Sequence, residues 1–186
     1  MGHTNQMMSK LHAGWSRCTK CRLHKTRKMV VIGEGFSPAD ILFIGEGPGK
    51  TENIYGRPFI GSAGKTLREI LAQAGAEAGS VTCFITNVVA CRPCDKINSK
   101  NRPPTDDEAW ACFPRLEKIY TLVRPKAVIF LGRVPERLCK KAFPEGRYIE
   151  HPASFERKGG LAGPHYRGYR QTFVDLLREV NHVRAD

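Results

Sequence analysis

The sequence has no apolar run long enough to cross a lipid bilayer, and its first residues, MGHTNQ, lack the apolar core of a secretory signal peptide. We therefore expect a cytoplasmic protein that does not enter a membrane. Hydrophobic residues make up 41% of the chain and charged residues 26%, which is typical of a globular protein. A length of 186 residues suits one domain, 1–186, in which we expect residues 1–10 to be flexible.

Acidic residues are scarce relative to basic ones. The chain has 18 Asp and Glu but 30 Lys and Arg, which gives a formal net charge of +12. Such an excess favours a polyanionic partner, because binding to basic side chains releases counterions from a nucleic acid. A charge that serves solubility, or an acidic protein partner, would have the same composition. We find no amphipathic helix with one strongly basic face, which disfavours a membrane surface.

An even set of cysteines is also missing. Seven cysteines cannot all pair, which argues against the disulfide framework of a secreted domain and favours a metal site in a reducing compartment. Cys18 and Cys21 form a C-x-x-C motif in a basic segment, while Cys91 lies before, and Cys112 within, a predicted helix. Cys94 forms a second C-x-x-C motif with Cys91 and is an alternative ligand. Four such thiolates could bind either zinc or an iron–sulfur cluster.

The remaining two cysteines have a different setting. Cys83 lies on an apolar predicted strand and Cys139 in a predicted helix, so we interpret both as small buried apolar residues. The long interval between Cys21 and Cys91 is unlike the compact spacing of a zinc ribbon. Spacing alone does not decide between zinc and an iron–sulfur cluster, and ordinary thiols without a metal are a third alternative.

Apolar β-forming runs alternate with amphipathic helical segments along the chain. The predicted strands cover 39–45, 81–90 and 126–132, with a short last strand in 147–154. The predicted helices cover 62–75, 105–123, 133–143 and 165–184. This alternation predicts an α/β fold, a three-layer αβα sandwich with a central, mainly parallel four-stranded sheet.

Two of the predicted helices begin with capping signals. Ser62 is a candidate N-cap for the helix 62–75, and Thr105 with Glu108 forms a capping box for the helix 105–123. The pair Arg124-Pro125 ends that second helix. These signals predict helix starts directly after two long loops.

The loop from Gly45 to Gly64, GEGPGKTENIYGRPFIGSAG, directly follows the first predicted strand. It does not match a phosphate-binding P-loop, because Lys50-Thr51 follows the wrong glycine spacing, and no G-x-G-x-x-G motif opens a helix. A nucleotide-cofactor site is therefore disfavoured. A loop of this length without regular structure usually serves a function. We expect it to meet the loops 87–94 and 151–155 in one crevice, because the carboxyl ends of parallel strands lie together.

The side chains in these loops suit a pocket for an extruded base. Phe59 could stack on a base, and Asn87 offers a donor and an acceptor that match a pyrimidine edge. Glu46 or Glu52 could orient water or stabilise a cationic sugar, and His151 could donate a hydrogen bond to a departing base anion. Each has an ordinary alternative, since Asn87 could cap a turn, Phe59 could be core and His151 could be structural.

Three of these segments resemble a known family. GEGPGKTENIYGRPFIGSAG is similar to the first motif of the iron–sulfur uracil-DNA glycosylases of family 4. TNVVACRP resembles the family's segment with a uracil-reading asparagine and a cluster cysteine, and HPAS resembles its second motif. The resemblance runs in order from about Cys18 to the C-terminal helix. It implies one uracil-DNA glycosylase-like domain that flips uracil out of DNA and hydrolyses its N-glycosidic bond.

The resemblance also implies roles for particular residues. Cys18, Cys21, Cys91 and Cys112 would bind a structural [4Fe–4S] cluster. The pocket residues and their implied roles are Glu46 and Gly47 in shaping the catalytic pocket, Glu52 nearby, Phe59 in stacking, Asn87 in reading the base and His151 beside the scissile bond. We expect a monofunctional enzyme, acting as a monomer, that leaves an abasic site without cutting the strand.

The resemblance leaves the DNA contacts to be placed from the residues. Basic side chains would grip phosphates, and the candidates are Arg57, Lys65, Arg157 and Lys158. Phe155, after the HPAS segment, is the candidate wedge that helps to extrude the nucleotide. The DNA could be single- or double-stranded.

Two loops differ from the family pattern. Lys50-Thr51-Glu52-Asn53 replaces an acidic run, and the interval between Cys91 and Cys112 is longer and contains CDKINSKN. These differences leave open a different modified base as the substrate. A non-catalytic iron–sulfur protein that binds nucleic acid, and a zinc-containing interaction module, are the other function classes.

Overall fold

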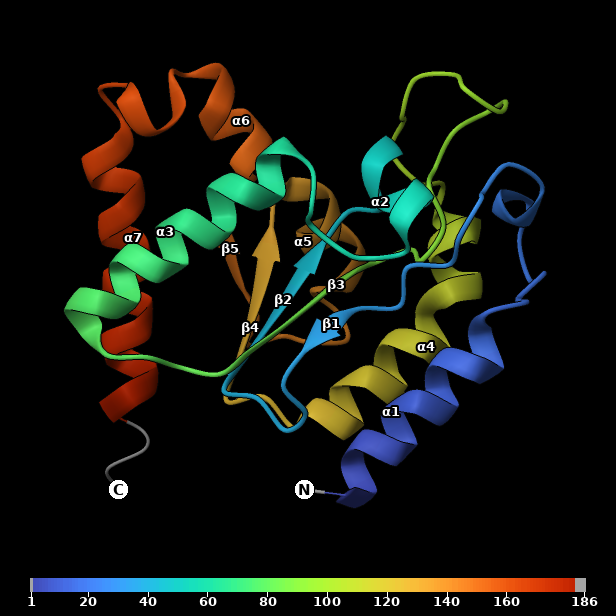
Figure 1. Ribbon diagram of the computed structural model, residues 1–186, viewed down its shortest axis with the longest axis horizontal. Helices are drawn as coiled ribbons and strands as arrows, with labels where there is room; N and C mark the ends of the chain where they lie inside the picture. The colour runs from blue at the N-terminus through green and yellow to red at the C-terminus, as the bar shows by residue number, and fades with distance from the viewer. Residues whose placement is uncertain (1, 183–186) are drawn as a thin grey trace.

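The protein is built around a twisted sheet of five strands in the order β1-β3-β2-β4-β5 (Figure 1). This computed structural model describes residues 2–182, with side chains from residue 6 onward. The strands are β1 Glu34–Gly35, β2 Ile41–Gly45, β3 Cys83–Asn87, β4 Ala127–Leu131 and β5 Arg147–Ile149. Strands β3, β2, β4 and β5 run parallel, whereas β1 pairs with β3 in the antiparallel sense.

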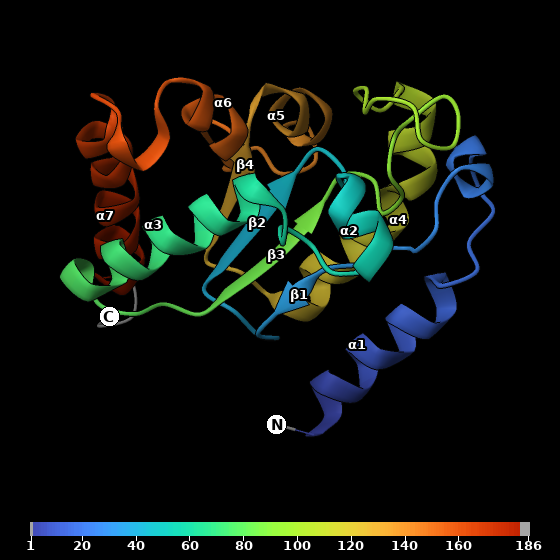
Figure 2. The ribbon, with the colours of Figure 1, turned by 45° about the horizontal axis from the view of Figure 1, so that its top comes forward.

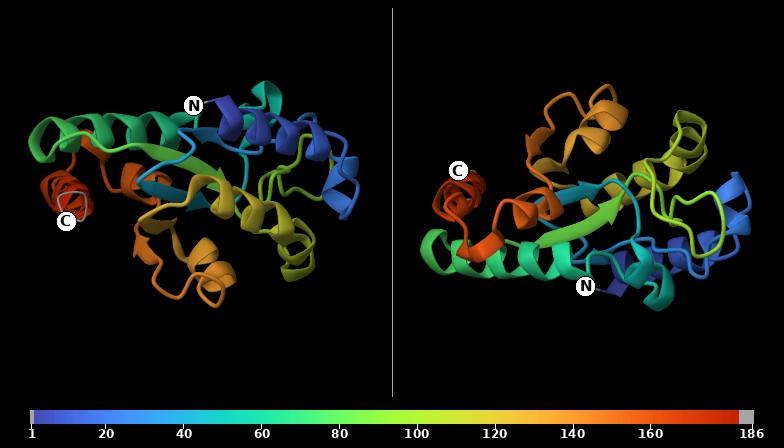
Figure 3. Two further views of the ribbon diagram at one scale, coloured as in Figure 1. Left: turned by 90° about the horizontal axis from the view of Figure 1, so that it is seen from below. Right: turned by 90° about the horizontal axis from the view of Figure 1, so that it is seen from above.

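Helices cover both faces of the sheet, so the predicted three-layer α/β fold is confirmed (Figure 3). The α-helices are α1 Gly2–Trp15, α2 Lys50–Tyr55, α3 Ser62–Ala78, α4 Asp106–Val123, α5 Arg133–Cys139, α6 Pro152–Arg157 and α7 Tyr166–His182. Two short 3-10 turns, η1 Arg22–Lys25 and η2 Gly160–Ala162, complete the described elements.

Side chains of β2 alternate between two apolar cores. Leu42 and Ile44 pack with residues of α1, α4 and α5, whereas Ile41 and Phe43 pack with residues of α3, α6 and α7. Every residue of β2 is buried, because a parallel strand covered on both faces has no polar side. The continuous apolar run at 39–45 therefore marks the centre of the sheet.

The sheet has one strand more than predicted. β1 has two residues, Glu34 and Gly35, and carries no apolar alternation from which sequence could detect it. It forms an edge, where a very short antiparallel strand is common. The four-stranded parallel part agrees with the prediction, and the fifth strand corrects it.

Several local predictions also change. Residues 2–15, which include part of the segment 1–10 that we expect to be flexible, form helix α1, whose Leu11 is buried in the core with α4. Helix α2 interrupts the loop expected to lack regular structure. Gly61, rather than Ser62, is the N-cap of α3. The last two residues of the predicted helix 165–184 lie outside the described residues, and none of the described helices is long and apolar enough to span a bilayer.

The capping box of α4 is confirmed. The Thr105 hydroxyl accepts a hydrogen bond from the Glu108 backbone N–H at 3.3 Å, and the Glu108 carboxylate accepts one from the Thr105 N–H at 2.9 Å. Reciprocal bonds of this kind satisfy two donors that a helix start otherwise leaves free. They fix the point at which the long loop before α4 ends.

Candidate active site and cysteine centre

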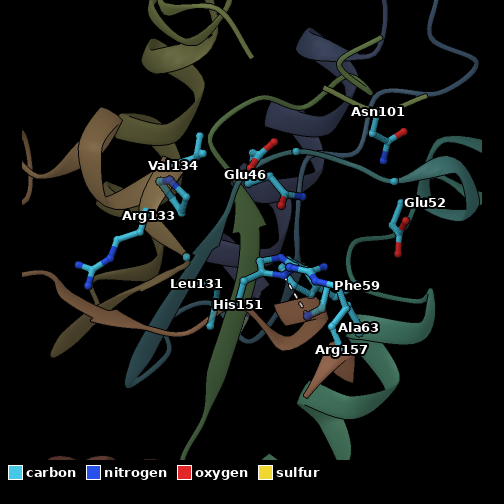
Figure 4. A pocket seen from close by; sticks show the side chains of 17 residues that line it. Glu46, Glu52, Phe59, Ala63, Asn101, Leu131, Arg133, Val134, His151 and Arg157 are labelled. Carbon is cyan, nitrogen blue, oxygen red and sulfur yellow. Dashed lines mark hydrogen bonds between the residues drawn. The ribbon is translucent and has the colours of Figure 1, made fainter. Parts of the chain in front are cut away.

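A pocket of about 450 Å³ opens at the carboxyl ends of the parallel strands (Figure 4). Loops after β2, β3, β4 and β5 line it, as expected for an open parallel sheet. Seven predicted site residues meet there, namely Glu46, Gly47, Glu52, Phe59, Asn87, His151 and Arg157. Its volume is within the usual range for a small-molecule site.

Asn87, the last residue of β3, carries the clearest sign of a missing ligand. Its side chain is 2% exposed, and its Oδ1 atom has no hydrogen-bond partner among the described residues. Buried amide oxygens are nearly always hydrogen-bonded, because an unpaired one costs about 1–3 kcal/mol. Because the unpaired oxygen belongs to a side chain that lines the pocket, we expect a ligand to supply the missing hydrogen-bond donor.

The backbone beneath Asn87 is held by a fully buried arginine of α4. Arg115 donates to the carbonyls of Asn87 and Val88 and to that of Ile32, and to the Thr86 hydroxyl. The side chain of Arg115 is 0% exposed. This clamp fixes the end of β3 while leaving the Asn87 amide free to face the pocket.

Phe59 forms part of the pocket wall and of the apolar core. It is 7% exposed, and its ring centroid lies 6.1 Å from that of His151. Its backbone has a φ of 51°, which is uncommon for a bulky residue and costs energy unless the surroundings impose it. Gly64 permits this path, since a Cβ there would lie 1.9 Å from the Phe59 carbonyl oxygen.

His151 lies between β5 and α6 and caps that helix. Its Nδ1 atom accepts a hydrogen bond from the Ala153 backbone N–H at 3.1 Å. Burial, together with the charge of Arg157, lowers the pKa of His151 below its usual value. The imidazole is therefore neutral near pH 7, and Nε2 carries the proton that can be donated in the pocket.

The two candidate carboxylates occupy different environments. Glu52 Oε1 accepts hydrogen bonds from the backbone N–H groups of Ile60 at 3.0 Å and Gly61 at 2.7 Å, which ties α2 to the start of α3. The half-buried Glu46 side chain makes no hydrogen bond or ion pair within the described part of the chain, and burial raises its pKa. Glu52 thus organises the loop, and Glu46 is the free carboxylate of the pocket.

The predicted phosphate contacts are not equivalent. Arg157 is exposed at the pocket and Lys65 is exposed on α3, whereas Arg57 donates two hydrogen bonds to Glu34 at 2.8 and 2.7 Å. Lys158 lies 2.8 Å from a carboxylate oxygen of Glu150. The charges of Arg57 and Lys158 are therefore partly neutralised by their own chain.

The wedge prediction for Phe155 is wrong for this structure. Phe155 is 1% exposed, and its ring stacks on Tyr169 with a centroid distance of 4.2 Å. The short helix α6 turns this side chain inward, where it packs in the same core as α7. A residue held in this way cannot enter a base stack without unpacking the core.

Four cysteines come together beside the N-terminal half of α4. Cys18, Cys21, Cys91 and Cys112 line one small pocket, and Cys94 is not among its described lining residues. Cys112 Sγ accepts a hydrogen bond from the Ala90 backbone N–H at 3.3 Å. Among the described residues, no three His, Cys, Asp or Glu side chains are grouped closely enough to hold a metal ion.

The donor set of this pocket suits a metal centre bound by thiolates. All four side chains are thiols, and backbone or guanidinium N–H groups already reach two of the sulfurs, as Arg27 donates to Cys91 at 3.6 Å. Burial raises the pKa of the Cys91 thiol to about 12, so a bound cation would be needed to hold this sulfur as a thiolate. These residues fit an iron–sulfur cluster.

The predictions for the other two cysteines, Cys83 and Cys139, have different outcomes. Cys139 is 0% exposed in the core and confirms the interpretation as a small apolar residue. Cys83 is only partly buried at the start of β3, and its sulfur contacts the Val81 carbonyl oxygen at 3.9 Å. Neither Cys83 nor Cys139 is among the described residues that line the four-cysteine pocket.

The family model of the uracil DNA glycosylase superfamily matches residues 32–177, which include every strand and the whole pocket. The chain belongs to this superfamily. A type-4 uracil-DNA glycosylase of Pyrobaculum aerophilum is 38% identical over 161 residues, which are 87% of this chain and 74% of that protein. The predicted resemblance to family 4 is thereby confirmed.

Other type-4 relatives align over a shorter span. The protein of Saccharolobus solfataricus is 47% identical over 118 residues, and that of Thermotoga maritima is 42% identical over 116 residues. These alignments cover 63% and 62% of this chain but 51% and 57% of the two relatives. The chain therefore spans about half the length of these two type-4 proteins.

This uracil-DNA glycosylase homologue also has pocket residues that sequence reasoning missed. Arg133 follows β4, and Asn101 lies in the long loop before α4; both line the pocket (Figure 4). The rule that strand ends converge would have found Arg133, because this residue directly follows the predicted strand 126–132. Asn101 lies too far beyond β3 for that rule to find it.

Proposed function

We propose that this protein removes uracil from DNA as a monofunctional glycosylase, leaving an abasic site. The observation that carries the proposal is the buried Asn87 amide oxygen, which has no partner among the described residues and lies in a pocket with Phe59 and His151. The names of the type-4 relatives support the same reaction. A flipped nucleotide is the form in which a base can enter such a pocket.

Uracil supplies what the Asn87 oxygen lacks. The N3–H of uracil is a donor, and the neighbouring O4 is an acceptor for the amide nitrogen of Asn87. Cytosine presents an unprotonated N3 to the same oxygen, so the orphan atom would remain unpaired. Phe59 then covers one face of the bound ring.

Gly45→Ala is expected to close this base site. A Cβ at Gly45 would lie 2.5 Å from Asn87 Oδ1 and 2.6 Å from Phe59 Cζ, so amide and ring would both be displaced. Excision under single-turnover conditions should fall roughly 100-fold, the scale expected when reacting groups are misplaced by about 1 Å. Gly75→Ala is the matched control, because a Cβ there meets nothing within 4 Å. Equal activity of the two variants would contradict the placement.

His151 is proposed to stabilise the departing base. As the C1′–N1 bond breaks, its electron pair moves to the uracil ring and the deoxyribose becomes a cationic oxocarbenium ion. The neutral imidazole donates its Nε2–H to the anionic base, while Nδ1 stays bonded to the Ala153 N–H. The lowered pKa of His151 favours this neutral donor over an imidazolium ion.

Glu46 is proposed to handle the attacking water. Water adds to C1′, its oxygen becomes the hydroxyl of the abasic sugar, and the Glu46 carboxylate accepts the proton. Glu52 is a poorer candidate because one of its oxygens is committed to Ile60 and Gly61. The freedom of the Glu46 side chain supports Glu46 over Glu52, a choice that the sequence left open.

The pH dependence of excision should report Glu46. Burial raises the pKa of this carboxyl, so the base form is lost at a higher pH than for an exposed glutamate. The rate should rise with pH through that raised pKa, and Glu46→Gln should lower the rate about 100-fold or more and remove this acidic limb. A pH–rate profile of both proteins from acidic to neutral pH gives the answer. The same acidic limb in the variant would exclude Glu46 as the base.

Cys18, Cys21, Cys91 and Cys112 are proposed to hold a [4Fe–4S] cluster. When bound, the cluster supplies cross-links between the N-terminal segment, the loop after β3 and α4, and no chemistry in the reaction. Arg115 lies one helical turn after Cys112 and clamps the end of β3. The same face of α4 therefore supports both the cysteine centre and the backbone of Asn87.

Arg157 and Lys65 are proposed as phosphate contacts at the pocket rim. Both side chains are exposed, and Arg157 lines the pocket itself. Arg133, which the sequence reasoning missed, is exposed across the pocket from Arg157 (Figure 4), but its pairing with Glu136 at 2.8 Å partly neutralises its charge, as for Arg57 and Lys158. Cations at this rim would hold the backbone of the strand whose base is extruded.

The test is excision from oligonucleotides that carry one uracil, thymine, cytosine or hypoxanthine at the same position. Strand breaks that appear after alkali, and only in the uracil strand, are the expected result. Breaks without alkali would show a lyase activity that the proposal excludes. Alkali-sensitive sites in another strand, with the uracil strand intact, would assign a different base.

A further inference from the structure

We propose that the loop 92–102, which we call the arm, is a DNA-inserting element and that Ile97 at its tip is the wedge. The inference rests on the proposed function, because a wedge is needed where a nucleotide is drawn out of a duplex. Phe155 is buried in the core, so it does not serve as this wedge. The arm offers an apolar side chain in a better position.

The arm stands at the mouth of the pocket. It connects β3 to α4 and lies near the carboxyl ends of the parallel strands, the end of the sheet at which α2 and α6 also lie (Figures 1 and 2). Its Asn101 lines the pocket, and Ile97 is four residues away along the chain. Four residues span at most roughly 14 Å, so the tip stays within reach of the base pairs beside an extruded nucleotide.

The tip exposes one apolar side chain between cations. Ile97 is 65% exposed, which is unusual for isoleucine, and Lys96 and Lys100 are exposed on either side of it. The Ser99 N–H donates to the Lys96 carbonyl oxygen at 3.1 Å, which closes a tight turn with Ile97 at its apex. Lysines beside an apolar tip suit a duplex, where they meet phosphates while the tip enters between bases.

Two arginines make the arm rigid. The buried Arg92 donates to the Ser99 carbonyl and, at 2.6 Å, to Asn101 Oδ1. Arg102 donates to Asp95 at 2.7 Å and to both oxygens of Glu108, at 2.7 and 2.8 Å. These bonds fasten the arm to the start of α4, so inserting the tip would not require the loop to be ordered first.

The arm also fixes the direction of the Asn101 amide. Because Oδ1 accepts from Arg92, the amide nitrogen is the atom left to face the pocket. An N–H donor at this rim matches a phosphate or sugar oxygen of the extruded nucleotide. One rigid element would therefore contact both the extruded nucleotide and the duplex from which it came.

The test compares excision of one uracil from a single strand and from a U·A duplex of the same sequence. Ile97→Ala should excise from the single strand within about 2-fold of the wild type and from the duplex roughly 10-fold more slowly, since only the duplex needs a wedge. Ile97→Leu should excise uracil from the duplex at the wild-type rate. Equal loss on both substrates, or no loss on the duplex, would overturn the proposal.

Leu161→Ala is the matched comparison, because Leu161 is 41% exposed in η2, beyond α6. A duplex-specific loss in Leu161→Ala, with Ile97→Ala unaffected, would place the wedge there and overturn the assignment. Unchanged thermal midpoints are expected for both variants, since both side chains are exposed.

A second measurement separates the arm from the chemistry. A 2-aminopurine beside the target position in a duplex becomes brighter when it is unstacked, whether or not a base is excised. Wild-type protein at saturation should raise this fluorescence, and Ile97→Ala should not. If no uracil is excised even from single strands, the proposed function fails, while this signal still decides the role of the arm.

Discussion

Asn87→Ala is expected to lower single-turnover excision of uracil by roughly 100- to 1,000-fold, while the affinity for DNA stays nearly unchanged. The size follows from losing a preorganised donor and acceptor in a site shielded from water. DNA affinity should persist because phosphate contacts supply most of it. The measurement is the excision rate at saturating protein, together with the dissociation constant for a uracil-containing strand. Equal loss of both quantities would contradict a base-reading role.

The folding stability of the same variant sharpens the test. Asn87 Oδ1 lacks a partner among the described residues, so removing it takes away a buried polar atom that costs about 1–3 kcal/mol. The free energy of unfolding of Asn87→Ala should therefore be at least as high as expected when a side chain of this size is lost from a pocket wall. Asn181→Ala, which loses a hydrogen bond to the Ala78 carbonyl oxygen far from the pocket, should show the reverse, with lower stability and full activity.

Cys91→Ala is expected to abolish cluster binding, whereas Cys94→Ala should leave it intact. Cys91 lines the four-cysteine pocket and Cys94 does not, although they lie three residues apart and are 7% and 2% exposed. Loss of the cluster should lower the free energy of unfolding by more than about 4 kcal/mol, because the cross-links that it makes between three segments are also lost. The checks are iron content, absorbance at roughly 400 nm and the thermal midpoint of anaerobically purified protein.

This pair of variants also tests the metal itself. Both substitutions remove one buried sulfur of the same size, so a general packing defect would affect them alike. Loss of iron in Cys94→Ala with retention in Cys91→Ala would reverse the ligand assignment. Colourless wild-type protein that contains zinc would contradict the iron–sulfur proposal.

The sequence predicted the frame of the site well, because parallel strands leave a strong signal. The runs 39–45, 81–90 and 126–132 are apolar since both faces of the sheet are covered, and their carboxyl ends must meet. That rule was enough to bring Asn87 and His151 into one pocket. It could not show that the Asn87 oxygen is unpaired, which depends on atoms from distant segments.

The failures came where tertiary packing decides the direction of a side chain. Phe155 follows a motif that suggests an exposed loop, but α6 turns it onto Tyr169. Glu52 and Glu46 are both acids of one loop, and only the position of α2 shows that Glu52 binds backbone N–H groups. Arg115 gave no signal at all, because an arginine in an amphipathic helix is normally exposed.

The most direct test of the account is release of free uracil from a single-stranded oligonucleotide with one uracil, measured by chromatography of the products from protein with its full iron content. One free uracil and one alkali-sensitive abasic site per strand are expected from the wild-type protein, and neither product is expected from Asn87→Ala at the same DNA occupancy. Bound but intact uracil strands with the wild-type protein would contradict the proposed function.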